Sequence, residues 1–266
     1  MELPLALRRG LRIFMIVALV LLYIPLLLVV VNSFNQSRTF GFPPTGFTVE
    51  WWQKAANSSG ALSALGTSVL AGVCAMLIAL VLGSLAAFAV QRFRFFGRST
   101  VSFLVLLPIT LPGIVTGIAL NASFLSVGAE LGIITVIIGH ATFCIVIVFN
   151  NVQARLRRMG SSLEEASADL GANGWQTFWM VTFPGIRGAL VAGALLAFAL
   201  SFDEIVVTTF TAGPDVQTLP LWIFGNLFRP NQAPVVNVVA AVLIICAIVP
   251  VWLAQKLSDD SLTSRV

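Results

Sequence analysis

The sequence predicts an all-α membrane protein that crosses the bilayer six times, as a single domain over residues 1–266. Hydrophobic residues make up 58% of the chain and charged residues only 10%, and the mean hydropathy is +0.97. Soluble domains are much more polar. Apolar runs recur along the chain, and each is long enough, as a helix, to cross a hydrocarbon core of about 30 Å. The six spans are expected at about 13–33, 65–90, 101–121, 131–152, 186–211 and 235–255.

The basic residues predict how these spans are oriented. When the N-terminus is placed in the cytoplasm and the spans alternate, twelve of the fifteen Lys and Arg residues fall on the cytoplasmic side. Cytoplasmic loops carry an excess of Lys and Arg, so both termini are expected in the cytoplasm. The first apolar run is expected to be a span and not a signal peptide, because its core is too long and lacks an Ala-x-Ala site. Basic residues scattered between apolar runs also disfavour nucleic-acid binding.

Enzymes and metal sites find little support in the sequence. The two lysines, Lys54 and Lys256, follow no glycine-rich run, so any ATPase must be another chain. His140 is the only histidine, and we expect neighbouring helices, not a metal, to satisfy it. A serine hydrolase is disfavoured because no Gly-x-Ser-x-Gly is present. Three cysteines without metal-ligand spacing are expected to be buried free thiols: Cys74, Cys144 and Cys246.

A polar insert, residues 161–184, separates the fourth and fifth predicted spans. Two Ser-x-x-Glu patterns, which begin at Ser161 and Ser162, offer alternative capping boxes for a short helix. Gly171 and Gly174 are expected to interrupt this helix. A second short helix should follow, and Pro184 is expected to close it.

The insert also carries an aromatic face and an acidic helix. Trp175, Phe178 and Trp179 lie at i, i+3 and i+4, so they share one side of a helix. Exposed aromatic side chains need a cover, which is either the membrane surface or a groove on a partner protein. Acidic residues fit poorly on an anionic bilayer surface, which favours the protein partner. The acidic residues are Glu164, Glu165 and Asp169.

Two features inside the spans are candidates for a solute pathway. Asp203 and Glu204 are adjacent carboxylates in the fifth span, where charges are costly. They follow Arg187 by 16 residues, or roughly 24 Å of helix, which places them toward the outer leaflet. Adjacent side chains point about 100° apart, so only one is expected to face a cavity. In the third span, Pro108 and Pro112 predict a kink with freed carbonyls that are either structural or line a pathway.

Small residues recur in the second span and predict close contact with another helix. They are Ala71, Gly72, Ala75, Ala79, Gly83 and Ala87.

The insert has the spacing of a known transporter motif. Its matching residues are Glu165, Ala166, Gly171 and Pro184. With this spacing the insert resembles the EAA loop of ABC-importer permeases, in which Glu-Ala-Ala is followed by Gly, Ile and Leu-Pro at fixed distances. Ser167, Val181 and Phe183 depart mildly from that pattern.

Further stretches extend the resemblance over nearly the whole chain. They are FGFPPTGFTVEWW, LPITLPGIVTGIAL, LSFDEIVVTTFTAG and TLPLWIF. Together they are similar to the second permease of spermidine/putrescine importers. The resemblance implies a type I importer permease fold in the inner membrane of a bacterial cell. It also implies inward movement of a polyamine or a related small organic solute by alternating access.

The resemblance also implies partners and site residues. The loop at about 155–185 would form cytoplasmic coupling helices that sit in a cleft of an ATPase dimer. The four matching residues inherit that role, and the acidic and aromatic side chains of the insert are assigned to the same partner. A homologous second permease and an extracytoplasmic solute-binding protein would complete the importer. ATP and Mg²⁺ would bind to the ATPase, and this chain would bind no cofactor.

Other interpretations stay open at this point. Intramembrane acids and six spans also fit a self-contained channel or secondary carrier for small cations. A different solute class within the ABC importers is possible as well. A membrane scaffold protein would use the aromatic face for docking without transport.

Overall fold

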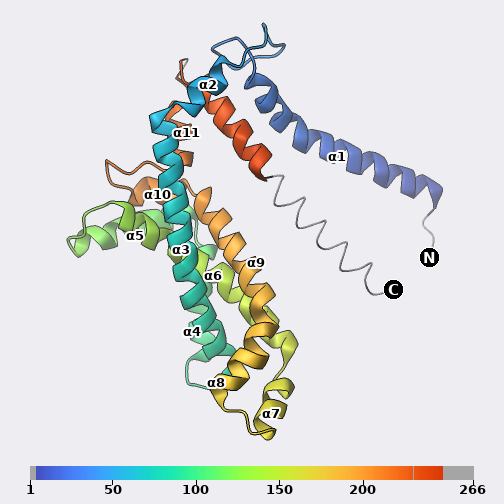
Figure 1. The fold of residues 1–266 in the computed structure, drawn as a ribbon, viewed down its shortest axis with the longest axis vertical. Coiled ribbons are helices and arrows are strands. Elements are labelled where there is room, and N and C mark those ends of the chain that lie inside the picture. The colour runs from blue at the N-terminus through green and yellow to red at the C-terminus, as the bar shows by residue number, and fades with distance from the viewer. Residues whose placement is uncertain (1–3, 230, 248–266) are drawn as a thin grey trace. The chain divides into compact units, whose positions relative to one another are not determined.

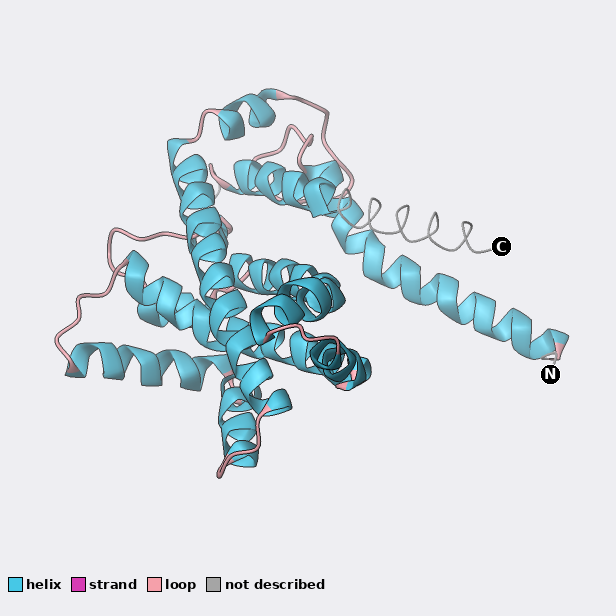
Figure 2. Ribbon diagram, turned by 60° about the horizontal axis from the view of Figure 1, so that its bottom comes forward, coloured by secondary structure: helices cyan, strands magenta, loops and turns pink. Residues whose placement is uncertain are grey.

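A computed structural model of the chain describes residues 4–229 and 231–247, and helices joined by loops make up this part of the chain, apart from one isolated bridge between Asn35 and Phe47 (Figures 1 and 2). The prediction of an all-α protein is therefore confirmed for the described part of the chain. The elements are α1 (Leu5–Asn32), α2 (Glu50–Ala56), α3 (Ser59–Arg92), α4 (Arg98–Thr110), α5 (Gly113–Ser126), α6 (Ile133–Met159), α7 (Ser162–Asp169), α8 (Gly174–Thr177), the π-helical turn η1 (Phe178–Thr182), α9 (Phe183–Phe202), α10 (Val206–Thr211), α11 (Leu219–Asn226) and a further helix, Ala233–Ala247.

Contacts group the chain into two compact units, residues 63–222 and residues 1–62 with 223–266. In the second of these, the loop between α1 and α2 is organised by Trp51, whose indole Nε1 donates to the carbonyl of Asn35 at 2.9 Å. Phe34 stacks on Trp52 with ring centroids 5.0 Å apart. None of the apolar window of α1 is buried by the described residues. The single domain over residues 1–266 stays a prediction.

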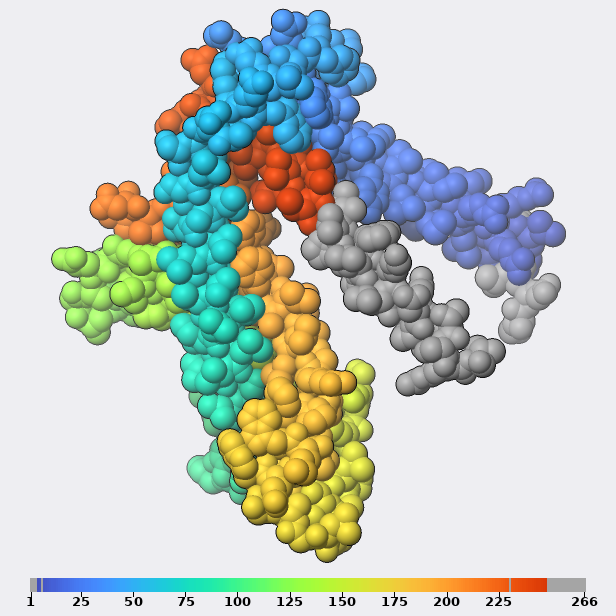
Figure 3. All heavy atoms as spheres, in the orientation of Figure 1, coloured from blue at the N-terminus to red at the C-terminus, as the bar shows by residue number. Residues whose placement is uncertain are grey.

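The larger unit is built around α3, α6 and α9, and Figure 3 shows α3 and α9 side by side over much of their length. Small residues permit this packing, as the sequence predicts. A Cβ added at Gly72 would lie 3.0 Å from the Phe198 ring of α9, and one added at Gly83 would lie 2.8 Å from the Ile145 carbonyl oxygen of α6. Both glycines therefore mark places where α3 touches another helix.

Four described helices are long and apolar enough to cross a membrane: Leu7–Asn32, Ser59–Arg92, Ile133–Met159 and Gly174–Phe202. A fifth span results if α4 and α5, which are bent by 107°, count as one. The apolar helix Ala233–Ala247 is shorter, and the rest of the predicted sixth span lies outside the described residues. The number of six spans and the positions of the termini stay predictions.

The third predicted span is not one kinked helix but two helices, which corrects the expectation for residues 101–121. The break falls at Pro112, because the residue before a proline avoids the helical region and Leu111 is extended (φ −82°, ψ 145°). Pro112 then precedes the first residue of α5. Pro108 stays inside α4. A bend of 107° is far larger than a proline kink within a continuous helix.

The fifth predicted span, residues 186–211, is also interrupted. α9 ends at Phe202, and α10 begins at Val206. Between them, the Glu204 carboxylate accepts the backbone N–H of Val207 at 2.8 Å, which satisfies one of the free donors at the start of α10. Glu204 therefore has a structural role at the break that the sequence does not reveal.

Candidate functional site

The polar insert folds as two short helices and a π-helical turn, at the end of the larger unit where α6 ends and α9 begins (Figure 1). Gly171 ends α7 with φ +85°, a left-handed conformation that glycine adopts without strain. The Gly171 N–H donates to the Ala168 carbonyl at 2.9 Å, and the Ala172 N–H donates to the Ser167 carbonyl at 3.1 Å. This pair of bonds is a Schellman motif. The predicted stop at Gly171 is confirmed.

The predicted capping boxes at Ser161 and Ser162 are wrong. Ser161 precedes α7 but makes no side-chain capping bond, and Ser162 lies inside the helix. Both boxes need a glutamate that turns back to the helix start, whereas Glu164 pairs with Arg92 of α3. The side-chain cap of the insert lies instead at α8, between Asn173 and Gln176.

The α8 cap has two reciprocal bonds. The Asn173 side chain accepts the Gln176 N–H at 2.9 Å, and the Gln176 side chain accepts the Asn173 N–H at 2.9 Å. This is a capping box with Asn and Gln in place of Ser and Glu. The Asn-x-x-Gln spacing is a signal for this cap, which was not among the predicted caps.

Pro184 does not close the second short helix, which corrects another expectation. α8 continues through η1 directly into α9, and Pro184 lies in the first turn of α9. A proline lacks the N–H that a helix interior requires, and the helix widens to a π-helical turn directly before this residue. The result is one helical stretch from Gly174 to Phe202.

The three aromatic residues of the insert have two different environments. Phe178 is half-buried and contacts Phe88 of α3, with ring centroids 5.9 Å apart. Trp175 and Trp179 pack edge to face at 5.7 Å, yet they remain 71% and 46% exposed. Phe178 therefore anchors the insert to α3, while the two tryptophans present apolar surface.

The acidic residues of α7 also differ in their exposure to solvent. Glu165, Ala166 and Asp169 are exposed. Glu164 is half-buried, and its Oε1 accepts from Arg92 Nη2 at 2.9 Å and from Thr182 Oγ1 at 2.8 Å. The glutamates are neighbours in sequence, and one helical step of about 100° separates the inward from the outward carboxylate.

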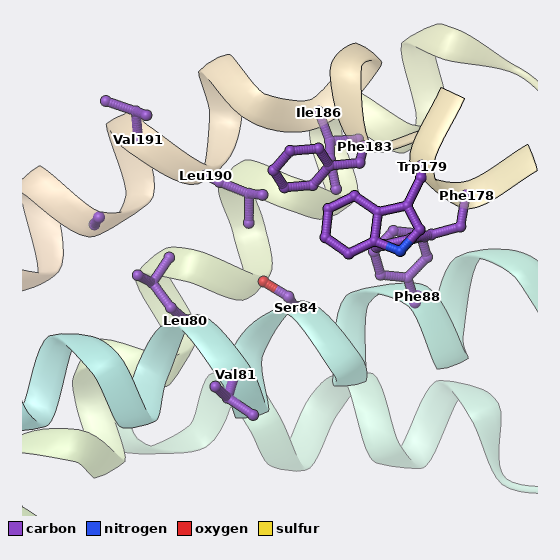
Figure 4. Close-up of a pocket in the computed structure, with 11 residues that line it drawn as sticks. Leu80, Val81, Ser84, Phe88, Phe178, Trp179, Phe183, Ile186, Leu190 and Val191 are labelled. Atoms are coloured by element: carbon purple, nitrogen blue, oxygen red, sulfur yellow. The ribbon is translucent and has the colours of Figure 1, made fainter. Parts of the chain in front are cut away.

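An apolar groove of about 360 Å³ opens between α3 and the start of α9, and Figure 4 shows its lining. Phe178, Trp179 and Phe183 form its end nearest the insert, opposite Phe88. Ser84 contributes the hydroxyl in this lining, and that oxygen is buried without a hydrogen-bond partner among the described residues. The groove therefore lies beside the contact between Phe88 and Phe178, which anchors the insert to α3.

The structure brings the two helix breaks together. A Cβ added at Gly113, the residue after Pro112, would lie 3.5 Å from Val206 at the start of α10. Asn121 of α5 donates to the Phe210 carbonyl at 2.7 Å, which satisfies a free carbonyl near the end of α10. Asp203, the other predicted pathway acid, lies exposed at this junction. Pro108 lies inside α4, about one helical turn before the break.

His140 ties the break to α6. Its Nδ1 lies 2.7 Å from Ser201 Oγ of α9, and its Nε2 lies 2.8 Å from Thr208 Oγ1 of α10. Thr208 donates its own hydroxyl proton to the Glu204 carbonyl, so it accepts from Nε2–H, and Ser201 donates to Nδ1. The expectation that neighbouring helices satisfy His140 is confirmed.

Metal-ligating side chains do not gather in the described part of the chain. No group of three or more His, Cys, Asp or Glu residues there is arranged to hold a metal ion. The three cysteines are free thiols. Cys144 is buried, but Cys74 is only partly buried and Cys246 is exposed, so the expectation of three buried thiols is wrong for Cys246.

Comparison with known proteins decides the family. Residues 79–260, which include the insert and both helix breaks, match the family described as binding-protein-dependent transport system inner membrane component. The chain belongs to this family. It is therefore an inner-membrane, multi-pass ABC-importer permease, and as a permease component it is a non-catalytic subunit.

Three curated relatives cover most of the permease. The spermidine/putrescine transport system permease protein PotC of Escherichia coli (strain K12) is 35% identical over 239 residues, or 90% of each chain. PotC of Haemophilus influenzae is 34% identical over 245 residues, covering 92% of the permease and 95% of the relative. The putrescine transport system permease protein PotI of Escherichia coli (strain K12) is 34% identical over 230 residues, covering 84% and 81%.

A solved structure supports the fold. A chain of a bacterial ABC transporter involved in the import of the acidic polysaccharide alginate superposes with a TM-score of 0.67, over 95% of the permease and 97% of that chain. At 18% identity this likeness shows the ABC-importer permease fold alone.

Proposed function

We propose that this permease moves a polyamine, such as putrescine or spermidine, or a related small organic solute inward as part of an ATP-driven importer. One observation carries the solute class: three relatives named for putrescine or spermidine/putrescine transport are 34–35% identical over most of their length. A homologous second permease, a solute-binding protein and an ATPase dimer that binds ATP and Mg²⁺ complete the importer. Uptake of labelled putrescine and spermidine by the assembled importer in vesicles tests the proposal. Uptake of neither polyamine, with ATPase stimulated by another organic solute, would reassign the solute class.

We further propose that α7 and α8 are the coupling helices that dock on the ATPase from the cytoplasmic side, with both termini on that side and six spans. Twelve of fifteen basic residues support this orientation. Exposed Glu165, Trp175 and Trp179 supply charge and apolar area for a protein partner. Closure of the ATPase dimer would move these helices and switch the permease between inward-facing and outward-facing states.

Charge reversal on α7 tests the docking proposal. Glu165→Lys should abolish ATPase association and lower solute uptake by more than about tenfold, because reversal of a charge at an interface leaves a repulsive contact. Gly171→Asp should have a similar effect, because an aspartate is strained at φ +85°. Co-purification with the ATPase and uptake into vesicles are the measurements. Asp215→Lys, an exposed acid between α10 and α11, is the matched control and should co-purify normally. Normal co-purification of the Glu165 variant would disprove the docking role.

We propose that Asp203, at the junction of the two helix breaks, attracts a cationic solute weakly. Support comes from its exposure and from the second break at Pro112 nearby. Asp203→Asn should lower uptake of a polyamine about fivefold, the effect of a charge interaction of ~1 kcal/mol, and leave ATPase association unchanged. Glu204→Gln should do less, because the amide oxygen still accepts the Val207 N–H. Equal loss of uptake and of ATPase association by Asp203→Asn would indicate misfolding and reject the pathway role.

A further inference from the structure

We propose that Arg92, Glu164 and Thr182 form a latch through which α7 moves the end of α3, so that these three are positioning residues for transport. The proposal rests on the docking role of α7 and α8, and it names the internal contact that passes their movement to the membrane helices. We call this contact the latch.

The latch joins three segments that are far apart in the sequence. Arg92 is the last residue of α3, Glu164 lies in the first turn of α7, and Thr182 ends η1. One oxygen, Glu164 Oε1, accepts from Arg92 Nη2 at 2.9 Å and from Thr182 Oγ1 at 2.8 Å. A single carboxylate therefore holds α7 against both α3 and the entrance to α9.

The burial of the pair distinguishes it from ordinary surface ion pairs. The Arg92 and Glu164 side chains are only 17% and 21% exposed. The other ion pair of the described residues, between Lys54 and Glu50, is 51% and 58% exposed. Exposed pairs contribute little, whereas loss of one member of a largely buried pair leaves a charge without compensation. The latch therefore resists separation of α7 from α3.

The backbone around α7 favours transmission through the latch. Gly160, with φ +67°, precedes α7, and Gly171, with φ +85°, follows it. Both ends of α7 are thus non-helical joints at glycine, where the chain turns most easily. The movement of a helix joined in this way depends on its side-chain contacts, and the latch is the charged contact between α7 and the membrane helices.

The surroundings of the latch leave room for it to change. A pocket of about 350 Å³ is lined by residues of α3, α7, α8 and η1, among them Arg92, Glu164 and Thr182. Arg92 Nε is buried and has no hydrogen-bond partner among the described residues. The guanidinium has further donors beside the one it uses, so Glu164 can shift across Arg92 without losing the ion pair.

The division of the two glutamates fits the proposal. Glu165 is exposed, where a partner protein can reach it, and Glu164 points inward to the latch. In this arrangement Glu165 binds the partner, and Glu164 passes the movement on. When the partner moves α7, the latch would displace the end of α3.

The test uses the complete importer in proteoliposomes and measures solute transported per ATP hydrolysed. Glu164→Gln and Arg92→Met should keep the ATPase associated and hydrolysing ATP, but transport per ATP should fall about tenfold, because the ion pair is largely removed from water. The exchange of Arg92→Glu with Glu164→Arg should restore part of the ratio. If the contact were purely structural, its loss would lower the amount of folded importer and the total uptake together. The solute transported per ATP hydrolysed would then be unchanged.

Smaller variants keep the test decisive if Arg92→Met does not assemble. Thr182→Val removes one bond to Glu164 and should lower the ratio, whereas Thr182→Ser keeps the hydroxyl and should not. Glu50→Gln, which breaks the exposed pair with Lys54, is the control and should behave as wild type. Wild-type ratios for Glu164→Gln and Thr182→Val would overturn the latch. If Glu165→Lys still binds the ATPase, the docking role fails instead, so the two failures are distinguishable.

Discussion

Gly83→Leu should prevent α3 from packing on α6 and remove most of the folded permease from the membrane. A Cβ at this position would lie 2.8 Å from the Ile145 carbonyl oxygen and 3.1 Å from the Phe149 nitrogen. Both are backbone atoms of α6, so no side-chain rotation relieves the clash. Overpacking against side chains costs about 1–3 kcal/mol, and a leucine wedged against backbone should cost at least ~3 kcal/mol.

The measurement is the yield of monodisperse permease after detergent extraction, together with its thermal unfolding. Gly66→Leu on the same helix is the matched control, because nothing lies within 4 Å of a Cβ added there. Gly83→Ala should fall between the two. Equal yield and equal unfolding temperature for Gly83→Leu and Gly66→Leu would contradict the close contact between α3 and α6.

His140→Leu should destabilise the permease by about 2–4 kcal/mol, because it removes two hydrogen bonds and leaves the buried Ser201 hydroxyl without its partner. His140 is 1% exposed, so water cannot replace the lost bonds. Since Ser201 and Thr208 lie on opposite sides of the break between α9 and α10, the break should also lose its fixed geometry. Uptake should therefore fall more than the amount of folded protein does.

Thermal unfolding and uptake per folded permease measure these two effects. Thr142→Val on the same helix is the control, because the Thr142 hydroxyl bonds only the carbonyl of Gly139 one turn earlier, at 2.6 Å. That variant should change stability by less than about 1 kcal/mol. If His140→Leu had the unfolding temperature and the uptake of the wild type, the hydrogen bonds of His140 to Ser201 and Thr208 would contribute neither to stability nor to transport.

Local patterns predicted much of the fold correctly. The helical class follows from composition and from the length of the apolar runs, which are local properties of the chain, and four described helices are long and apolar enough to cross a membrane. The stop at Gly171 also follows from a local rule, since a left-handed residue at a helix end favours glycine. The small residues of α3 predicted close packing, and the structure identifies α6 and α9 as the helices that approach.

The failures share a different cause. Pro184 was expected to end a helix, yet proline is equally acceptable in the first turn of one, and only the π-helical turn before it decides between the two. The prolines of the third span predicted a kink but not a break into two helices, and the break after Phe202 lies between apolar stretches, where hydropathy does not reveal it. Arg92 and Glu164 are 72 residues apart, and no pattern in one sequence indicates that they pair.

The π-helical turn η1 gives the orientation of α8 an unusual origin. A π-helix closes its hydrogen bonds over five residues instead of four, so it holds one residue more than an α-helical turn. Trp179 lies within this turn and Trp175 lies just before it, in α8. The orientation of the two tryptophans therefore depends on the number of residues in this turn as well as on side-chain chemistry. Deletion of one residue from η1 should turn the side chains that precede it by about 100° relative to α9.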